Sequence, residues 1–204
     1  MNILSTEEAL TKIKEADVLL YRAQDFPNAG WWIAKYTGGQ HSHVGLAHKD
    51  RDDWYCVEQK EFKGGRSIYL PNAIERNPNR IDVYRVVPVV YEPYFNGELK
   101  WTTKEFTEDI AHKVTRTALT ITGNSYGWKN IYNIAKGYAP FLRLRRSEKC
   151  DDEKISQAYV CSTVISYSYR INYVDPCPHI SDDRTTPADI ARSAVLKYLF
   201  TIGE

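Results

Sequence analysis

In the stretch Tyr159-Val160-Cys161-Ser162-Thr163-Val164-Ile165, a short apolar approach leads into a predicted helix whose first residue is a cysteine. A thiol at a helix N-terminus lies among unpaired backbone N–H groups and at the positive end of the helix macrodipole, and both favour the thiolate form. A buried cysteine with a purely structural role is the alternative interpretation. Cys161 is therefore a candidate nucleophile whose partners must come from elsewhere in the chain.

The second informative stretch is Gln40-His41-Ser42-His43-Val44-Gly45-Leu46-Ala47-His48. Its apolar residues predict a strand, residues 54–58 predict another, and turn-forming residues separate the two. A turn centred between residues 50 and 51 places His43 directly opposite Glu58, with Cβ atoms about 4.5–5.5 Å apart. An imidazole can reach a carboxylate over that distance, whereas a register slip of one residue would move the two side chains to different faces.

These residues match the three roles of cysteine catalysis. A cysteine nucleophile needs a base that accepts the thiol proton and a third polar group that steadies the base. Cys161, His43 and Glu58 supply these roles in that order. His41 is an alternative base on the same predicted strand face, but only His43 faces Glu58. Cys56 shares the face of Glu58, and a buried structural thiol is predicted there.

A metal site is the rival interpretation of the two histidines. The spacing of His41 and His43 places both rings on one face of a strand, as a metal site requires. The sequence offers no third ligand at a suitable spacing, so neither a metal nor another cofactor is predicted. Cys177 and His179 lie in a proline-containing loop and have no predicted chemical role.

Composition predicts an ordinary globular protein. The 204 residues suit a single domain, with 26% charged and 43% hydrophobic residues. Lys and Arg number 27 against 26 Asp and Glu, so the formal charge of +1 predicts no nucleic-acid partner. The sequence has no basic start followed by an apolar run and no apolar segment of about 18 residues, which predicts no signal peptide and no stable membrane insertion. A cytoplasmic location is expected.

Local patterns predict the order of the elements. Strands are expected at 17–22, 41–48, 54–59, 66–70 and 81–88, and a loop at 91–100. Helices are expected at 6–15, at 31–36, at 106–121 after a capping box at 102–105, from about 128 to 138, and at 161–172. The last helix is expected to begin at Thr186-Pro187 and to have on its apolar face Ile190, Ala194, either Leu196 or Val195, Tyr198 and Leu199.

The histidine and cysteine stretches resemble motifs of a known enzyme family. His43 and its neighbours resemble the Ser-His-Val-Gly element of the permuted NlpC/P60 cysteine hydrolases, and residues 159–162 resemble their Cys-Ser nucleophile motif. The cysteine follows the histidine, as in the circularly permuted branch, and the match is nearest to the YaeF/YiiX group of papain-like amidases. Residues 123–128, Gly-Asn-Ser-Tyr-Gly-Trp, resemble the Gly-x-x-Tyr-x-Trp element of the same family.

The resemblance implies an α+β, circularly permuted papain-like fold over residues 1–204, with an antiparallel sheet packed against helices that include the one beginning at Cys161. It implies a catalytic Cys161, His43 and Glu58, with Tyr126 and Ser162 near the substrate or the oxyanion. The implied activity is that of a cysteine hydrolase that cleaves an amide bond through a thioester. The expected substrate is a small peptide, a peptidoglycan fragment or an acyl-amine.

Two other functions remain open from the sequence. A thiol-dependent acyltransferase or lipid-ester hydrolase, similar to the lecithin:retinol acyltransferase relatives, would use the same cysteine with an apolar groove and a different acceptor. A non-catalytic binding module would keep Cys161 buried and inert. The oligomeric state does not follow from the sequence.

Overall fold

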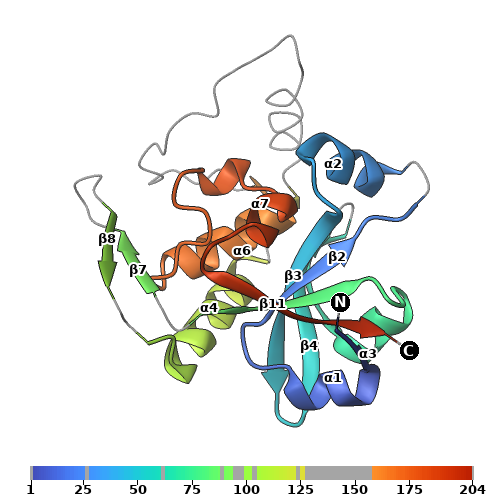
Figure 1. The fold of residues 1–204 in the computed structure, drawn as a ribbon. Coiled ribbons are helices and arrows are strands. Elements are labelled where there is room, and N and C mark those ends of the chain that lie inside the picture. The colour runs from blue at the N-terminus through green and yellow to red at the C-terminus, as the bar shows by residue number, and fades with distance from the viewer. Residues whose placement is uncertain are drawn as a thin grey trace.

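A computed structural model describes residues 2–25, 28–60, 63–87, 90–93, 99–102, 105–122, 125–126 and 158–203. These residues form a seven-stranded sheet with helices on both of its faces (Figure 1). The expected mixture of helices and strands is confirmed.

The strand order in the main sheet is β1-β11-β6-β2-β3-β4-β5. Neighbouring strands are antiparallel except β1 and β11, which are parallel. The bounds are β1 Ile3–Ser5, β2 Val18–Arg22, β3 His41–Asp50, β4 Asp53–Lys60, β5 Gly64–Tyr69, β6 Ile81–Val86 and β11 Leu196–Gly203. Two smaller pairs are β7 Val90–Pro93 with β8 Leu99–Thr102, and β9 Ser125–Tyr126 with β10 Ala158–Tyr159.

The described helices are α1 Thr6–Lys12, α2 Ala29–Thr37, α3 Leu70–Glu75, α4 Glu108–Ile121, α6 Cys161–Arg170 and α7 Pro187–Ala191, with a 3-10 turn η1 at Asp182–Arg184. None of these is long and apolar enough to cross a membrane. The predicted helix at about 128–138 lies outside the described residues.

The core consists of two apolar layers, one on each face of the sheet. Leu20 and Leu46 from the central strands pack with Val164 and Ile165 of α6, together with apolar residues of α4. The opposite face is covered by α1 and α3. Each fully buried aliphatic side chain contributes about 1.5–3 kcal/mol. This burial holds α6 firmly across β3 and so fixes where its first residue lies.

Helix starts agree with the sequence only in part. Thr186 caps α7 in a capping box with Asp189, and Pro187 takes the first helical position, as predicted. The predicted capping box at 102–105 is wrong. Strand β8 includes Thr102, and the cap of α4 is Thr107, whose side chain accepts the Ile110 N–H.

The predicted C-terminal helix is too long. Helix α7 ends at Ala191, and the chain continues as strand β11, which pairs with β6 from Leu196 opposite Val86 to Ile202 opposite Ile81. Aromatic and β-branched residues in β11 favour a strand, and the open edge of β6 offers it backbone partners. The sequence analysis also missed β1 and α3, and the loop expected at 91–100 contains parts of β7 and β8.

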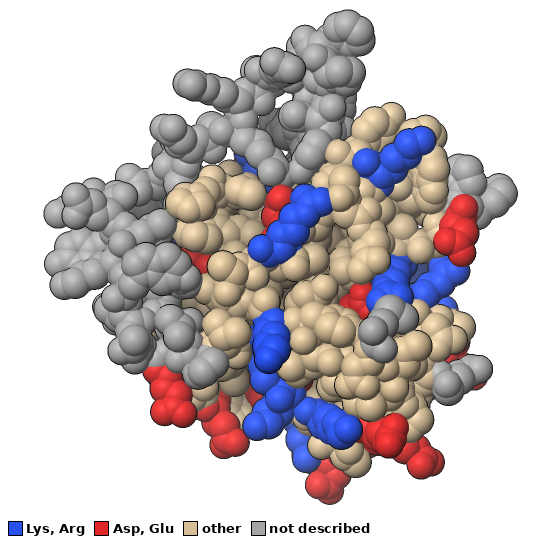
Figure 2. All heavy atoms as spheres, in the orientation of Figure 1, with Lys and Arg blue, Asp and Glu red and all other residues tan. Residues whose placement is uncertain are grey.

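Charges of the two signs are interspersed on the molecule. On the face drawn in Figure 2, Lys and Arg side chains lie in several separate groups from the upper right to the lower centre, and Asp and Glu side chains lie mostly along the lower margin. The described part of that face therefore carries no continuous field of one sign.

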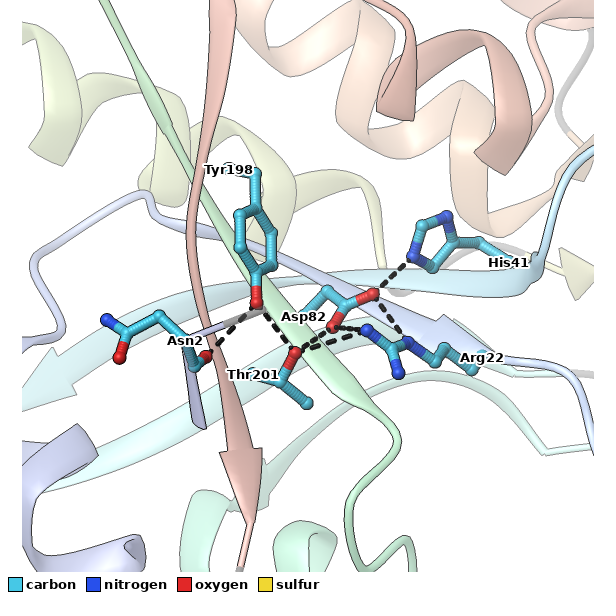
Figure 3. Close-up of polar contacts among 6 residues, drawn as sticks. All are labelled: Asn2, Arg22, His41, Asp82, Tyr198 and Thr201. Atoms are coloured by element: carbon cyan, nitrogen blue, oxygen red, sulfur yellow. Dashed lines mark hydrogen bonds and ion pairs between the residues drawn. The ribbon is translucent and has the colours of Figure 1, made fainter. Parts of the chain in front are cut away.

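A buried polar network ties the central strands to β11 (Figure 3). His41 Nε2 lies 2.7 Å from Asp82 Oδ2, Arg22 binds the same carboxylate through two nitrogens, and Thr201 donates to Asp82 Oδ1 at 2.6 Å. The Tyr198 hydroxyl extends the network from Thr201 to the backbone carbonyl of Asn2. Burial alone raises the pKa of Asp82, but hydrogen bonds from His41, Arg22 and Thr201 outweigh it and lower the pKa.

We expect Asp82→Asn to reduce the free energy of unfolding by about 3 kcal/mol, because it leaves Arg22 without its countercharge and disrupts the hydrogen bond with His41. Urea unfolding at neutral pH measures this loss. Asp109→Asn is the control, since Asp109 forms an exposed ion pair with Lys113 within one helix. Equal losses in the two variants would contradict the prediction.

Candidate functional site

The β3–β4 hairpin differs in register from the prediction. Glu58 lies opposite Gly45 rather than His43, and the turn is closed by Asp50 opposite Asp53, with Arg51 in the left-handed region at φ 55°. The predicted register is therefore wrong by two residues. Side chains alternate with a period of two along a strand, so this shift keeps His43 and Glu58 on one face as diagonal neighbours.

His43 and Glu58 form a short, buried hydrogen bond. His43 Nε2 lies 2.6 Å from Glu58 Oε2, and the residues are 6% and 2% exposed. The ring of Tyr21 packs against the imidazole with centroids 5.2 Å apart. The predicted contact between His43 and Glu58 is therefore present, although the register that predicted it is wrong.

Cys161 is the first residue of α6, whose N-cap is Val160 and which has no side-chain cap hydrogen bond. Cys161 affects the pKa of His43. Burial lowers the pKa of His43, but the charge of Cys161 and a hydrogen bond with it, followed by Glu58, outweigh burial and raise the pKa from 6.5 to about 9. The imidazole thus interacts with both a cysteine and a carboxylate and favours its protonated form.

Arg66 is the site residue that sequence reasoning missed. It lies directly opposite Glu58 on β5, and its Nε is 2.7 Å from Glu58 Oε1. Burial raises the pKa of Glu58, but hydrogen bonds and charges from His43 and Arg66 outweigh it and lower the pKa from 4.5 to about 2. Glu58 is therefore ionised at neutral pH. The sequence signal for Arg66 was its position in the strand predicted at 66–70. That position identifies Arg66 as a partner of Glu58 only when the register of this strand against β4 is known.

His41 has a different set of partners. The β2–β3 pairing shifts between Tyr21 opposite His43 and Arg22 opposite His41, which places a bulge at Ser42. His41 binds Asp82 on β6, whereas His43 binds Glu58 on β4. The two imidazoles therefore do not meet at one site. The described part of the chain contains no group of three His, Cys, Asp or Glu side chains arranged to hold a metal ion.

Tyr126 and Ser162, which were predicted to lie near the substrate or the oxyanion, are both close to Cys161: Tyr126 through strand pairing and Ser162 as the next residue in the chain. The backbone of Tyr126 in β9 pairs with Tyr159 in β10, two residues before Cys161. The side chain of Tyr126 lies outside the described part. Ser162 is buried, and its Oγ donates to the backbone carbonyl of Thr185 at 2.5 Å. This bond ties the first turn of α6 to the segment that precedes α7.

The other described cysteines are buried. The Tyr21 hydroxyl lies 3.2 Å from Cys56 Sγ, and burial raises the pKa of the Cys56 thiol far above its usual range. Cys177 is buried, and His179 is exposed. Cys56 is therefore held as a neutral thiol beside the Tyr21 hydroxyl, in agreement with its predicted structural role.

Comparisons with known proteins leave the function to be argued from the site. No protein-family model matches the chain, and no curated protein matches it. Among solved structures, the chain is similar to the crystal structure of the metalloprotein yiiX from Escherichia coli O157:H7, DUF1105. The two share 14% sequence identity and a TM-score of 0.48, over 94% of this chain and 98% of that chain.

We expect Glu58→Gln to lower the pKa of His43 from about 9 toward 6.5, because the substitution removes a negative charge 2.6 Å from the ring. Cys161→Ser should lower it as well, because the thiol supplies the larger favourable contribution. NMR titration of the histidine ring signals measures both effects. A His43 titration that is the same in both variants and in the unsubstituted chain would contradict this account.

The pair also predicts how stability depends on pH. His43, with its raised pKa, stabilises the folded state fully below pH 6.5, and this contribution is lost as pH rises through about 9. Glu58, with its lowered pKa, contributes fully above pH 4.5 and less as pH falls toward about 2. The contribution of the pair is therefore complete between pH 4.5 and 6.5.

Urea unfolding at about pH 5.5 and about pH 9.5 measures the alkaline loss. In His43→Gln the difference between the two pH values should shrink, because the titrating ring is gone. An unchanged difference would assign the alkaline loss to other groups.

Proposed function

We propose that this protein is a cysteine hydrolase with a circularly permuted papain-like fold, which cleaves an amide bond through Cys161, His43 and Glu58. One observation carries the proposal. The ring of His43 lies between the ionised carboxylate of Glu58, at 2.6 Å, and the thiol of a cysteine at the N-terminus of a ten-residue helix. A nucleophile, a base and a group that orients the base are the components of thiol catalysis.

In the first half of the proposed reaction, the Cys161 thiolate attacks the carbonyl carbon of the substrate amide. The C–S bond forms, and the carbonyl electron pair moves to oxygen. The backbone N–H of Cys161, at the positive end of α6, is positioned to stabilise this oxyanion. As the intermediate collapses, the C–N bond breaks, and the His43 imidazolium gives its proton to the leaving amine.

In the second half, water attacks the thioester that the acyl group forms with Cys161. Neutral His43 accepts a proton from the water as the C–O bond forms, and the thiolate leaves when the C–S bond breaks. Glu58 keeps one tautomer of His43 oriented through its bond to Nε2 and stabilises the imidazolium each time it forms. The products are a carboxylic acid and an amine.

The proposed substrate is a small peptide, a peptidoglycan fragment or an acyl-amine. Each presents an amide carbonyl with an amine leaving group, which is the bond that this thiol and imidazolium are suited to cleave. An acyl acceptor other than water would convert the same thioester into a transfer product.

The first test of the proposal is alkylation of the protein by iodoacetamide between about pH 5 and 9, with the modified peptides located by mass. Cys161 should be labelled selectively at pH values well below 8.5, where an ordinary thiol reacts slowly. Labelling should fall at least about tenfold in His43→Ala. Cys161, Cys56 and Cys177 are all buried, so Cys56 and Cys177 serve within each sample as internal controls without a histidine partner in the proposed mechanism.

Hydrolysis of a set of acyl-amine and peptide amide substrates, with acid and amine products followed by mass, then tests the reaction itself. Cys161→Ser should abolish product formation and leave the fold intact, because serine is nearly isosteric with cysteine. If Cys161 stays unreactive in the folded chain, or reacts identically in His43→Ala, the proposed function is wrong.

A further inference from the structure

Both carboxylate oxygens of Glu58 are occupied, each by a different cation donor. Oε2 accepts from His43 at 2.6 Å, and Oε1 accepts from Arg66 Nε at 2.7 Å and from Arg66 Nη2. Glu58 is 2% exposed. A carboxylate held on both sides in this way has no freedom to rotate, so the direction in which Oε2 faces the imidazole is set by the guanidinium.

Strand pairing also fixes the backbone position of Arg66. Arg66 pairs directly with Glu58 between β5 and β4, and Gly65 beside it lies against the backbone of Thr122, which follows α4. A Cβ at Gly65 would lie 1.6 Å from the Thr122 carbonyl oxygen, so only glycine fits there. Strand β5 is therefore seated tightly against the end of α4, and Arg66 starts from a rigid position.

The side chain of Arg66 is 26% exposed, whereas the carboxylate it binds is buried. Loss of the guanidinium would leave Glu58 Oε1 buried without a described partner. The carboxyl group would then rotate toward solvent or take up a proton, and either change removes the fixed acceptor of the His43 ring.

We propose that Arg66 is a positioning residue that holds the Glu58 carboxylate, and through it the His43 ring, in the orientation that activates Cys161. This inference rests on the proposed function for its catalytic meaning. The contacts that carry it are those of Arg66, Glu58 and His43 alone.

Three variants test it. Arg66→Met keeps much of the side-chain volume and removes the charge and the donors, and Arg66→Lys keeps the charge without the two-pronged donor geometry. Arg85→Met is the matched control. Arg85 binds the buried Asp17 through Nε and Nη2 at 2.7 Å each, also donates to the backbone carbonyl of Lys12, and is 28% exposed, so it is a partly exposed arginine on a buried carboxylate other than Glu58.

The first readout is the rate of Cys161 alkylation against pH. In Arg66→Met we expect the rate of Cys161 alkylation near neutral pH to drop about ten- to a hundredfold. The acid limb of the rate profile should move upward by about one pH unit or more. In Arg66→Lys, the acid limb should return close to its pH in the unsubstituted chain, whereas the alkylation rate should recover less. Arg85→Met should keep the profile of the unsubstituted chain, even if it lowers stability equally. The inference is overturned if Arg66→Met keeps the normal profile or if Arg85→Met changes it in the same way.

The second readout does not depend on thiol reactivity. The His43 ring N–H that is bonded to Glu58 should give a slowly exchanging NMR proton signal, retained in Arg85→Met and lost in Arg66→Met. Persistence of this signal in Arg66→Met overturns the inference. If Cys161 is unreactive in the unsubstituted chain, the proposed function fails, while the NMR signal still decides whether Arg66 holds the Glu58–His43 pair.

Discussion

Carboxylates buried in the fold need a cation, and this requirement shapes the whole molecule. Four buried acidic side chains each receive an arginine whose guanidinium reaches in from the surface and stays 20–28% exposed. The pairs are Asp17 with Arg85, Glu58 with Arg66, Asp82 with Arg22, and Asp182 with Arg170. Breaking such a pair is costly because one charge is left buried alone. The pairs connect β2 to β6, β4 to β5 and α6 to η1, so they fix strand and helix positions as well as charges.

Two of these carboxylates also hold a histidine, with different results. Asp82 binds His41 within a saturated network that includes Thr201, which locks the start of β3 to β6 and β11. Glu58 binds His43, whose ring has Cys161 as a further partner. The bulge at Ser42 separates the two histidines, so that one strand supplies an imidazole to Asp82 and another to Glu58. A buried pair of histidine and carboxylate thus connects strands of the sheet at Asp82 and orients the base of the proposed reaction at Glu58.

Local sequence signals predicted the parts of the fold that depend on local chemistry. The helix beginning at Cys161 and the proline-marked start of α7 follow from capping and helix geometry. The contact between His43 and Glu58 was predicted correctly although the register of β3 against β4 was not, because a shift of two residues leaves a side chain on the same face of its strand. Strand β11 was missed because its apolar residues fit a helical period as well, and only the distant edge of β6 selects the strand. Arg66 was missed because its role depends on the register of β5 against β4.

The strand order has a consequence for how the chain is made. Strand β11 lies between β1 and β6, and residues 87–195 separate it from β6 along the chain (Figure 1). Until β11 has been synthesised, β1 lacks its neighbour among the described strands, and β6 exposes one row of unpaired N–H and C=O groups. An open edge of this kind pairs readily with other nascent chains. The growing polypeptide is therefore expected to need chaperone protection until β11 has emerged and paired with both strands.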